Sequence, residues 1–169
     1  MLLEGTHVVT LMLFAGSILF VDLRLLGVLL PNRPVSKVAD SILPYTVGGF
    51  LVMLLTGTAL FFANPFEYYH NVIFRVKLVF VVAAAINIFI FHFRVQANRG
   101  AWDDAQRPPA KVRFAAGTSI ALWVAVIVAG RCMAYDWFSC DMASGFVAAA
   151  EQCQERTATL AAIEPGLAQ

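Results

Sequence analysis

Four long apolar runs divide the sequence, and they constrain the fold more than any other feature. They cover about residues 6–30, 43–63, 72–93 and 114–134. Each reaches about 20 residues or more, the length that an α-helix needs to cross about 30 Å of hydrocarbon. We therefore expect an all-α protein, with a four-helix transmembrane bundle over residues 1–137 and a tail over residues 138–169.

The composition excludes the main alternatives to a membrane protein. Only 14% of the residues are charged and 60% are hydrophobic, whereas soluble domains carry roughly a quarter charged residues. Low charge and 14 phenylalanines also exclude intrinsic disorder. A net charge of +1 gives no electrostatic basis for binding nucleic acid. The lipid bilayer is therefore the first expected partner.

The loops predict how the chain is threaded, because Lys and Arg favour the cytoplasmic side of a membrane. The connections after the first and third runs are basic, whereas residues 64–71 contain neither Lys nor Arg and the tail contains only Arg156. The basic residues of the two connections are Arg33, Lys37, Arg94, Arg99, Arg107, Lys111 and Arg113. We expect a multi-pass protein of a bacterial inner membrane, with both termini in the periplasm. The first run lacks the basic start and the cleavage site of a signal peptide, so it should remain as a helix.

Three cysteines lie toward the expected exterior, where an oxidising compartment permits disulfides. They are Cys132 at the end of the fourth run and Cys140 and Cys153 in the tail. Cys140 with Cys153 is the preferred pair, and three unpaired thiols are the alternative. Ala, Glu and Gln from residue 143 to 163 favour a short helix in this exterior tail.

Five ionisable residues are expected to gather in the exterior half of the bundle. They are His7, His70, Arg75, Lys77 and Arg131. His70 and Lys77, seven residues apart, should share one helical face. One hypothesis is a haem b whose iron is ligated by His7 and His70 and whose propionates pair with the basic side chains. Alternatives are a pocket for an anionic or quinone-like ligand, and side chains that extend to lipid phosphates.

A second polar group is expected near the cytoplasmic half, formed by Asp22, Arg24, Asn87 and His92. His70 and His92 are 22 residues apart, about 33 Å along a helix, so they cannot hold the same small ligand. Three histidines therefore exclude two stacked haems with two histidines each. His92 is expected to pair with Asp22, either as a structural contact or as a proton relay.

The polar positions also resemble a known family of small four-helix bacterial inner-membrane proteins of unknown function, and distantly the membrane part of copper-resistance protein D. The matching pieces are His7, the run Asp22 to Gly27, Thr56-Gly57 through Asn64-Pro65, Phe74 to Leu78, Asn87, His92, Gly130-Arg131 and Ala134-Tyr135. The resemblance spans about residues 5–137. It implies a membrane location and four helices, and it supplies no established activity.

These observations lead to one main hypothesis and two alternatives. The main one is a membrane subunit with a b-type cytochrome-like role, whose single haem relays electrons between a periplasmic redox partner and the quinone pool. The first alternative is a cofactor-free accessory or assembly subunit that binds other membrane subunits. The second is a small ion or solute transport component built on the Asp22 group. The sequence contains no phosphate loop, zinc motif or nucleophile motif, so independent catalysis is not expected.

Overall fold

A computed structural model describes residues 2–95 and 100–134. Its helices, in chain order, are α1 (Leu2–Leu25), α2 (Val35–Ala63), α3 (Pro65–His70), α4 (Val72–Ile90), the π-helical turn η1 (Phe91–Val95) and α5 (Ala110–Ala134). Four of them are long and apolar enough to cross a membrane: α1, α2, α4 with the start of η1, and α5. The described residues contain no strand, which confirms the expected all-α fold with four helices long and apolar enough to span a membrane.

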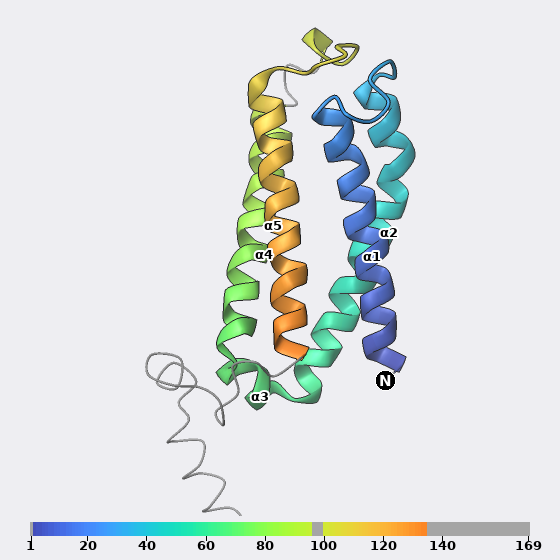
Figure 1. Cartoon of the computed structure of the whole chain (residues 1–169). Helices are drawn as coiled ribbons and strands as arrows, with labels where there is room; N and C mark the ends of the chain where they lie inside the picture. The colour runs from blue at the N-terminus through green and yellow to red at the C-terminus, as the bar shows by residue number, and fades with distance from the viewer. Residues whose placement is uncertain (1, 96–99, 135–169) are drawn as a thin grey trace, which may run out of the picture.

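The long helices form two antiparallel pairs. α1 packs along α2, α4 packs along α5, and contacts between α1 and α5 join the pairs. The first residues of α1 and the short α3 lie at one end, and the α1–α2 and η1–α5 connections lie at the other (Figure 1). We call these the α3 end and the loop end.

Helix α1 ends at Leu25, five residues before the end of its apolar run. Gly27 takes a left-handed conformation with φ of 77°, which glycine adopts without strain. Its N–H donates to Arg24 O at 3.0 Å, and the N–H of Val28 donates to Leu23 O at 3.0 Å. This pair of bonds is a Schellman motif, which closes the helix although apolar residues continue beyond it.

Helix α2 begins at Val35, about eight residues before the expected start. Its N-terminus is capped from a distant segment, since the N–H of Ser36 donates to the Asp103 carboxylate at 2.8 Å. The N–H of Val35 donates to the Asp103 carbonyl at 3.1 Å. The helix continues through Pro44, which neighbouring helices make tolerable in membrane spans.

The segment between α2 and α4 contains the short helix α3, which the sequence analysis did not predict. Asn71 separates α3 from α4. Its side chain caps the start of α4 by accepting a hydrogen bond from the N–H of Phe74 at 3.0 Å. Helix α5 begins at Ala110, after Pro108 and Pro109, four residues before its apolar run.

Two clusters of buried residues stabilise the bundle. The central cluster consists of Phe14, Ala84, Trp123 and Val126, and there the rings of Phe14 and Trp123 meet edge to face at 4.9 Å. The loop-end cluster consists of Leu25, Val35, Trp102, Val112 and Ala116. Trp102 is only 6% exposed, so this loop residue packs in the cluster and not on the surface.

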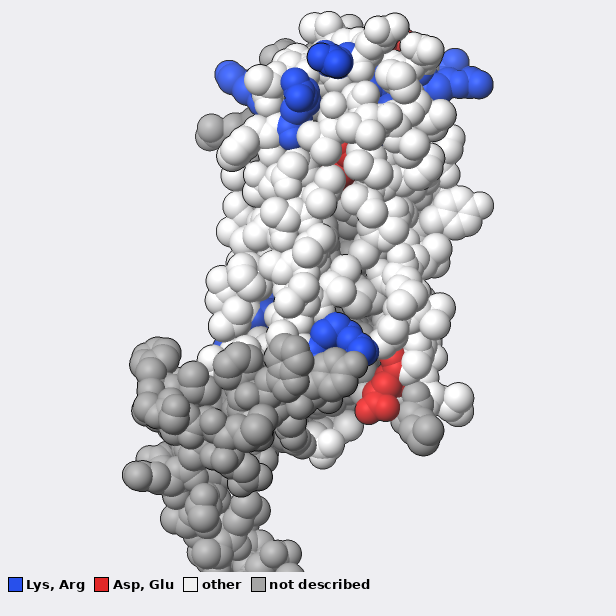
Figure 2. Space-filling model, viewed as in Figure 1, with Lys and Arg blue, Asp and Glu red and all other residues white. Residues whose placement is uncertain are grey.

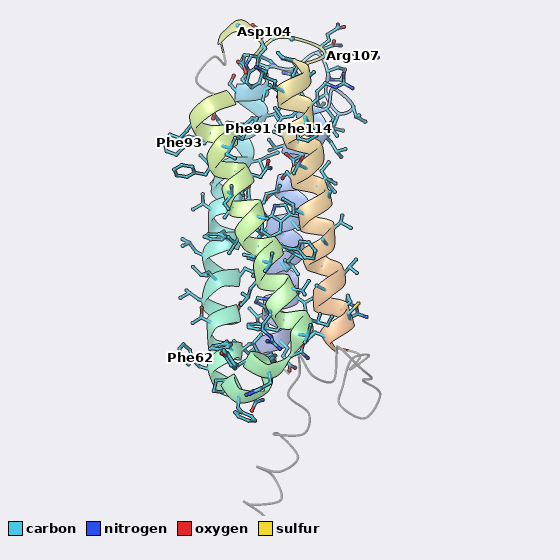
Figure 3. The ribbon with its side chains drawn as sticks, turned by 90° about the vertical axis from the view of Figure 1, so that its left-hand side faces the viewer. Phe62, Phe91, Phe93, Asp104, Arg107 and Phe114 are labelled. Carbon is cyan, nitrogen blue, oxygen red and sulfur yellow. The ribbon has the colours of Figure 1, made fainter. Side chains whose placement is uncertain are left out.

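The outer surface of the bundle is apolar. Phe62 and Phe93 are 71% and 61% exposed and project away from the helices (Figure 3). Figure 2 shows Lys and Arg gathered at the loop end, with a mostly uncharged band below them. Exposed apolar side chains on such a band are costly in water and favourable in lipid, which fits four membrane-spanning helices.

Candidate functional site

A cavity opens between the two helix pairs at the α3 end, and we call it the α3-end cavity. It consists of two overlapping volumes of ≈ 430 Å³ and ≈ 730 Å³. The residues that line both are His7, Leu11, Leu60, Tyr68, Lys77, Val126 and Met133. They come from all five α-helices, so the fold assembles this cavity from distant parts of the chain.

His7 is fixed in the cavity wall by α2. Its Nδ1 lies 2.9 Å from the Thr56 hydroxyl oxygen, and that hydroxyl donates its one hydrogen within α2, to Val52 O at 2.8 Å. In the tautomer with its hydrogen on Nδ1, the ring donates to Thr56, and Nε2 is the acceptor nitrogen outside this contact. A Cβ on Gly57 would lie 3.0 Å from His7 Cε1. Gly57 thus makes room for the ring, because any side chain at this position would contact it closely.

Lys77 reaches the cavity from the side of α4. Its Nζ lies 3.5 Å from the position that a Cβ on Gly130 would occupy, so the amino group rests against the backbone of α5. Within residues 2–95 and 100–134, this amino group has neither a hydrogen-bond nor an ion-pair partner. An ionisable group inside a membrane span is costly unless it is paired or hydrated, and such groups mark functional sites.

Aromatic rings form much of the remaining wall of the smaller volume. Phe61 stacks on Phe74 with centroids 5.7 Å apart, and Tyr68 contacts Phe74 at 5.6 Å. Trp123 also lines this volume and is 6% exposed. Its indole N–H is buried and has no hydrogen-bond partner among the described residues. An apolar, ring-lined space with a few nitrogen groups is the usual composition of a small-molecule site.

The structure brings some of the predicted exterior residues to this cavity and leaves others outside. Arg131 lines the larger volume, together with Glu4. His70 does not line either volume; its Nδ1 lies 2.8 Å from Phe66 O, and its ring contacts Phe66 at 4.3 Å. Arg75 is exposed and donates to the His70 carbonyl at 3.1 Å.

The expectation that His70 and Lys77 share one helical face was wrong. α3 ends at His70 and α4 begins at Val72, so the seven residues between them do not follow one continuous helix. A seven-residue spacing places two residues on one face only within an unbroken helix, and Asn71 lies between His70 and Lys77 as the cap of α4. His7 and Lys77 therefore meet at one cavity without His70.

In the second polar group, Arg24 donates hydrogen bonds to loop carbonyls and does not pair with Asp22. Arg24 is 0% exposed. Its Nε donates to Arg33 O at 2.8 Å, and one terminal nitrogen donates to Ala105 O at 3.2 Å. It thereby ties the α1–α2 connection to the segment that precedes α5.

Asp22, Asn87 and His92 also separate. The Asp22 carboxylate, 6% exposed, is hydrogen-bonded by Ser119 of α5, and one of its oxygens has no partner among the described residues. Asn87 donates to Ala115 O at 3.1 Å and so joins α4 to α5. His92 is exposed in the π-helical turn, with its ring against Phe93. The expected pairing of His92 with Asp22 is not formed, because Asp22 is buried inside the bundle and His92 is exposed on its surface.

The remaining site expectations concern metals and thiols. Within the described ranges, no group of three or more His, Cys, Asp or Glu side chains is arranged to hold a metal ion. Cys132, near the end of α5, forms no disulfide there. The preferred pair Cys140 and Cys153 lies outside the described residues.

Sequence reasoning identified His7 and Lys77 but missed the residues that orient them. Thr56, Gly57 and Gly130 entered the sequence analysis only as parts of the family pattern. The signal that points to them is a small residue facing each ionisable group, which becomes visible only when the helix register is known.

Comparison with known proteins places the chain in a family without adding an activity. No curated protein matches it, no solved structure matches it, and a link to copper-resistance protein D is not shown. One family model, described as "Family of unknown function (DUF6644)", matches residues 2–136. Because this match covers most of the sequence, the chain belongs to the family of unknown function DUF6644.

Proposed function

We propose that this protein is a membrane subunit that binds the head group of a quinone-type ligand in the α3-end cavity. The observation that carries the proposal is Lys77, an amino group within a membrane span that lines the cavity and has no partner among the described residues. A quinone carbonyl oxygen accepts hydrogen bonds, and Lys77 supplies donors for it.

Two further features support this ligand class. His7 keeps Nε2 free of its contact with Thr56, so it can accept a hydrogen bond from the hydroxyl of a reduced ligand. Phe61, Phe74 and Trp123 offer ring faces and edges to a flat aromatic head group. The larger volume adds space for an apolar tail beside Leu60 and Met133.

The proposal includes the sidedness of the cavity. The basic connections favour a cytoplasmic loop end, and residues 64–71 at the α3 end contain neither Lys nor Arg. The α3-end cavity then opens toward the periplasmic half of a bacterial inner membrane. A ligand there has access both to the lipid phase and to a periplasmic redox partner.

Titration of the purified protein with a short-chain quinone tests the proposal. We expect Lys77→Met to weaken binding at least tenfold, because a hydrogen bond from a charged donor is lost. Lys111→Met is the matched control, since Lys111 is exposed at the start of α5 and does not line the cavity. Equal affinity of the two variants, or no binding by the unaltered protein, would overturn the proposal.

A second candidate is the haem b of the cytochrome hypothesis, and the orientation of His7 favours it. Histidines that ligate metals commonly form a hydrogen bond through the other ring nitrogen, and His7 Nδ1 makes such a contact with the Thr56 hydroxyl. His7 would hold the iron, and Lys77 with Arg131 would pair with the propionates. A pyridine haemochrome spectrum of the purified protein separates the haem candidate from the quinone-type ligand. Only the haem candidate predicts b-type absorbance, and it predicts that this absorbance disappears in His7→Ala.

A further inference from the structure

A second hollow lies at the opposite end of the bundle, on the outer surface of the α1–α2 pair. It has a volume of ≈ 650 Å³ and is open along its length. We call it the α1–α2 groove. The residues that line it are Met12, Leu13, Gly16, Ser17, Phe20, Leu30, Arg33, Lys37, Val38, Ser41, Ile42 and Tyr45. It shares only Met12 with the α3-end cavity, so it is a separate feature.

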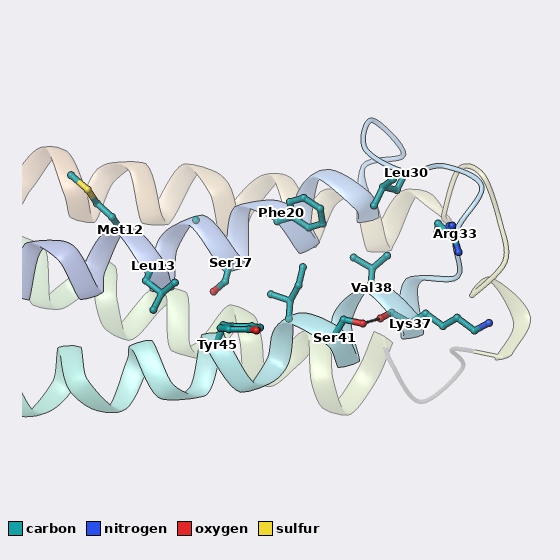
Figure 4. Close-up of a pocket in the computed structure, with 12 residues that line it drawn as sticks. Met12, Leu13, Ser17, Phe20, Leu30, Arg33, Lys37, Val38, Ser41 and Tyr45 are labelled. Atoms are coloured by element: carbon teal, nitrogen blue, oxygen red, sulfur yellow. Dashed lines mark hydrogen bonds between the residues drawn. The ribbon is translucent and has the colours of Figure 1, made fainter.

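The groove has a charged mouth and an apolar body. Arg33 and Lys37 lie at the loop end of it, and Met12 and Leu13 lie toward the other end (Figure 4). Phe20 and Tyr45 flank the groove between these ends (Figure 4). The hydroxyls of Ser17 and Ser41 are already bonded to carbonyls of their own helices, Phe14 O and Lys37 O. The body of the groove therefore presents mainly apolar surface.

The two cations at the mouth are not paired by any of the residues that the structure describes. Neither the Arg33 nor the Lys37 side chain has a hydrogen bond or an ion pair within residues 2–95 and 100–134. Asp40, the acid closest to them in sequence, does not line the groove. The mouth is thus complementary to an anion that comes from outside the described chain.

The length of the groove matches one leaflet. Met12 and Phe20 are eight residues apart, about 12 Å along α1, and the loop end adds the distance to Arg33. One leaflet provides about half of the 30 Å hydrocarbon thickness. An acyl chain in this groove would therefore run from the headgroup level to about the middle of the bilayer.

We propose that the α1–α2 groove is a binding site for an anionic phospholipid. Arg33 and Lys37 hold the phosphate, and an acyl chain lies along Phe20, Tyr45 and Leu13. A zwitterionic lipid fits the body of the groove but lacks the net charge that the mouth selects. A free phosphate fits the mouth but gains nothing from the body.

Gly16 provides a way to block the groove without disturbing the protein. A Cβ at Gly16 meets no atom within 4 Å, so Gly16→Leu can be accommodated and adds a large side chain at a position that lines the groove. Gly48 also has open space around it and does not line the groove. Gly48→Leu is therefore the matched control for the added side chain. Lys111→Gln with Arg113→Gln is the matched control for lost charge at the same end.

Native mass spectrometry of the full chain in detergent, with added phosphatidylglycerol or phosphatidylcholine of identical acyl chains, tests this site. We expect preferential binding of phosphatidylglycerol. Arg33→Gln with Lys37→Gln should weaken it about thirtyfold, the loss expected when two side chains attracted by an anionic headgroup are neutralised. Gly16→Leu should weaken the binding of both lipids, and both control variants should bind like the unaltered protein.

Three results would overturn the proposal. The first is equal binding of the two lipids, and the second is unchanged binding by Gly16→Leu. The third is displacement of phosphatidylglycerol by millimolar inorganic phosphate, which would show a site for free anions. Thermal midpoints measured in the same detergent identify any variant that fails to fold, and the single variants Arg33→Gln and Lys37→Gln then replace the double one.

Discussion

Arg24 shows how a single charged residue can organise one end of a membrane bundle. It is fully buried, and its guanidinium donates to backbone carbonyls on two different connections, Arg33 O and Ala105 O. Neither carbonyl belongs to a helix, so neither has a helical N–H as its partner. Arg24 therefore gives a hydrogen-bond partner to two loop carbonyls that no helix satisfies.

Replacing Arg24 should destabilise the protein more than replacing an exposed arginine at the same end. We expect Arg24→Met to lower the free energy of unfolding by about 2–3 kcal/mol, because two hydrogen bonds from a buried charged group are lost. Unfolding in detergent, followed by circular dichroism, measures the effect. Arg113→Met, at an exposed position, should change it little. Similar losses in the two variants would contradict this role.

The sequence could predict the candidate site residues only one by one. His7 and Lys77 are recognisable because ionisable side chains are unusual within apolar runs. The partner of His7 could not be predicted, since Thr56 lies 49 residues away and meets it only through the register of α1 against α2. The prediction that His70 shares a helical face with Lys77 failed for a similar reason. Asn71 starts a new helix, so the two residues belong to different helices.

At the scale of elements, two glycines differ in whether they tolerate a side chain: Gly27 does not, and Gly48 does. Gly27 has a φ of 77°, and a Cβ there would lie 2.8 Å from the Gln106 carbonyl oxygen. We expect Gly27→Ala to cost about 1–2 kcal/mol from the backbone conformation alone, with the contact adding to it. Gly48→Ala, inside α2 with open space around it, should leave stability unchanged or slightly higher.

Thermal unfolding of both variants in one detergent checks this expectation. The comparison also tests how α1 ends, because the Schellman motif depends on Gly27 at this position. If Gly27→Ala unfolded at the same temperature as Gly48→Ala, the turn after α1 would have to differ from the one described.

The elements themselves were largely predictable, and their ends were not. Apolar length was enough to find the four spans, because a bilayer requires about 20 apolar residues in each. The start of α2 was missed because its cap is Asp103, 67 residues later in the sequence. Lys37 and Asp40 also made the first turns of α2 resemble a loop, although charged residues are tolerated at the ends of membrane helices.

The whole molecule is polarised along its long axis. The loop end carries the basic cluster (Figure 2) and the capped start of α2, and the α3 end carries the cavity with His7 and Lys77. The two proposed ligands therefore lie at opposite ends. If the loop end faces the cytoplasm, the α1–α2 groove meets the cytoplasmic leaflet and the quinone-type site meets the periplasmic half.

Cysteine accessibility tests this sidedness on the intact molecule. In a variant whose three native cysteines are replaced by serine, Tyr69→Cys places a thiol on α3, where Tyr69 is 65% exposed. Asp104→Cys places one on the exposed loop end (Figure 3). A membrane-impermeant maleimide added to intact bacterial cells should label Tyr69→Cys at once and Asp104→Cys only after the cells are permeabilised. The opposite pattern would place the α3-end cavity on the cytoplasmic side. A ligand in that cavity could then not exchange electrons with a periplasmic partner. The lipid proposal for the α1–α2 groove does not depend on this result and would still be tested by its own experiment.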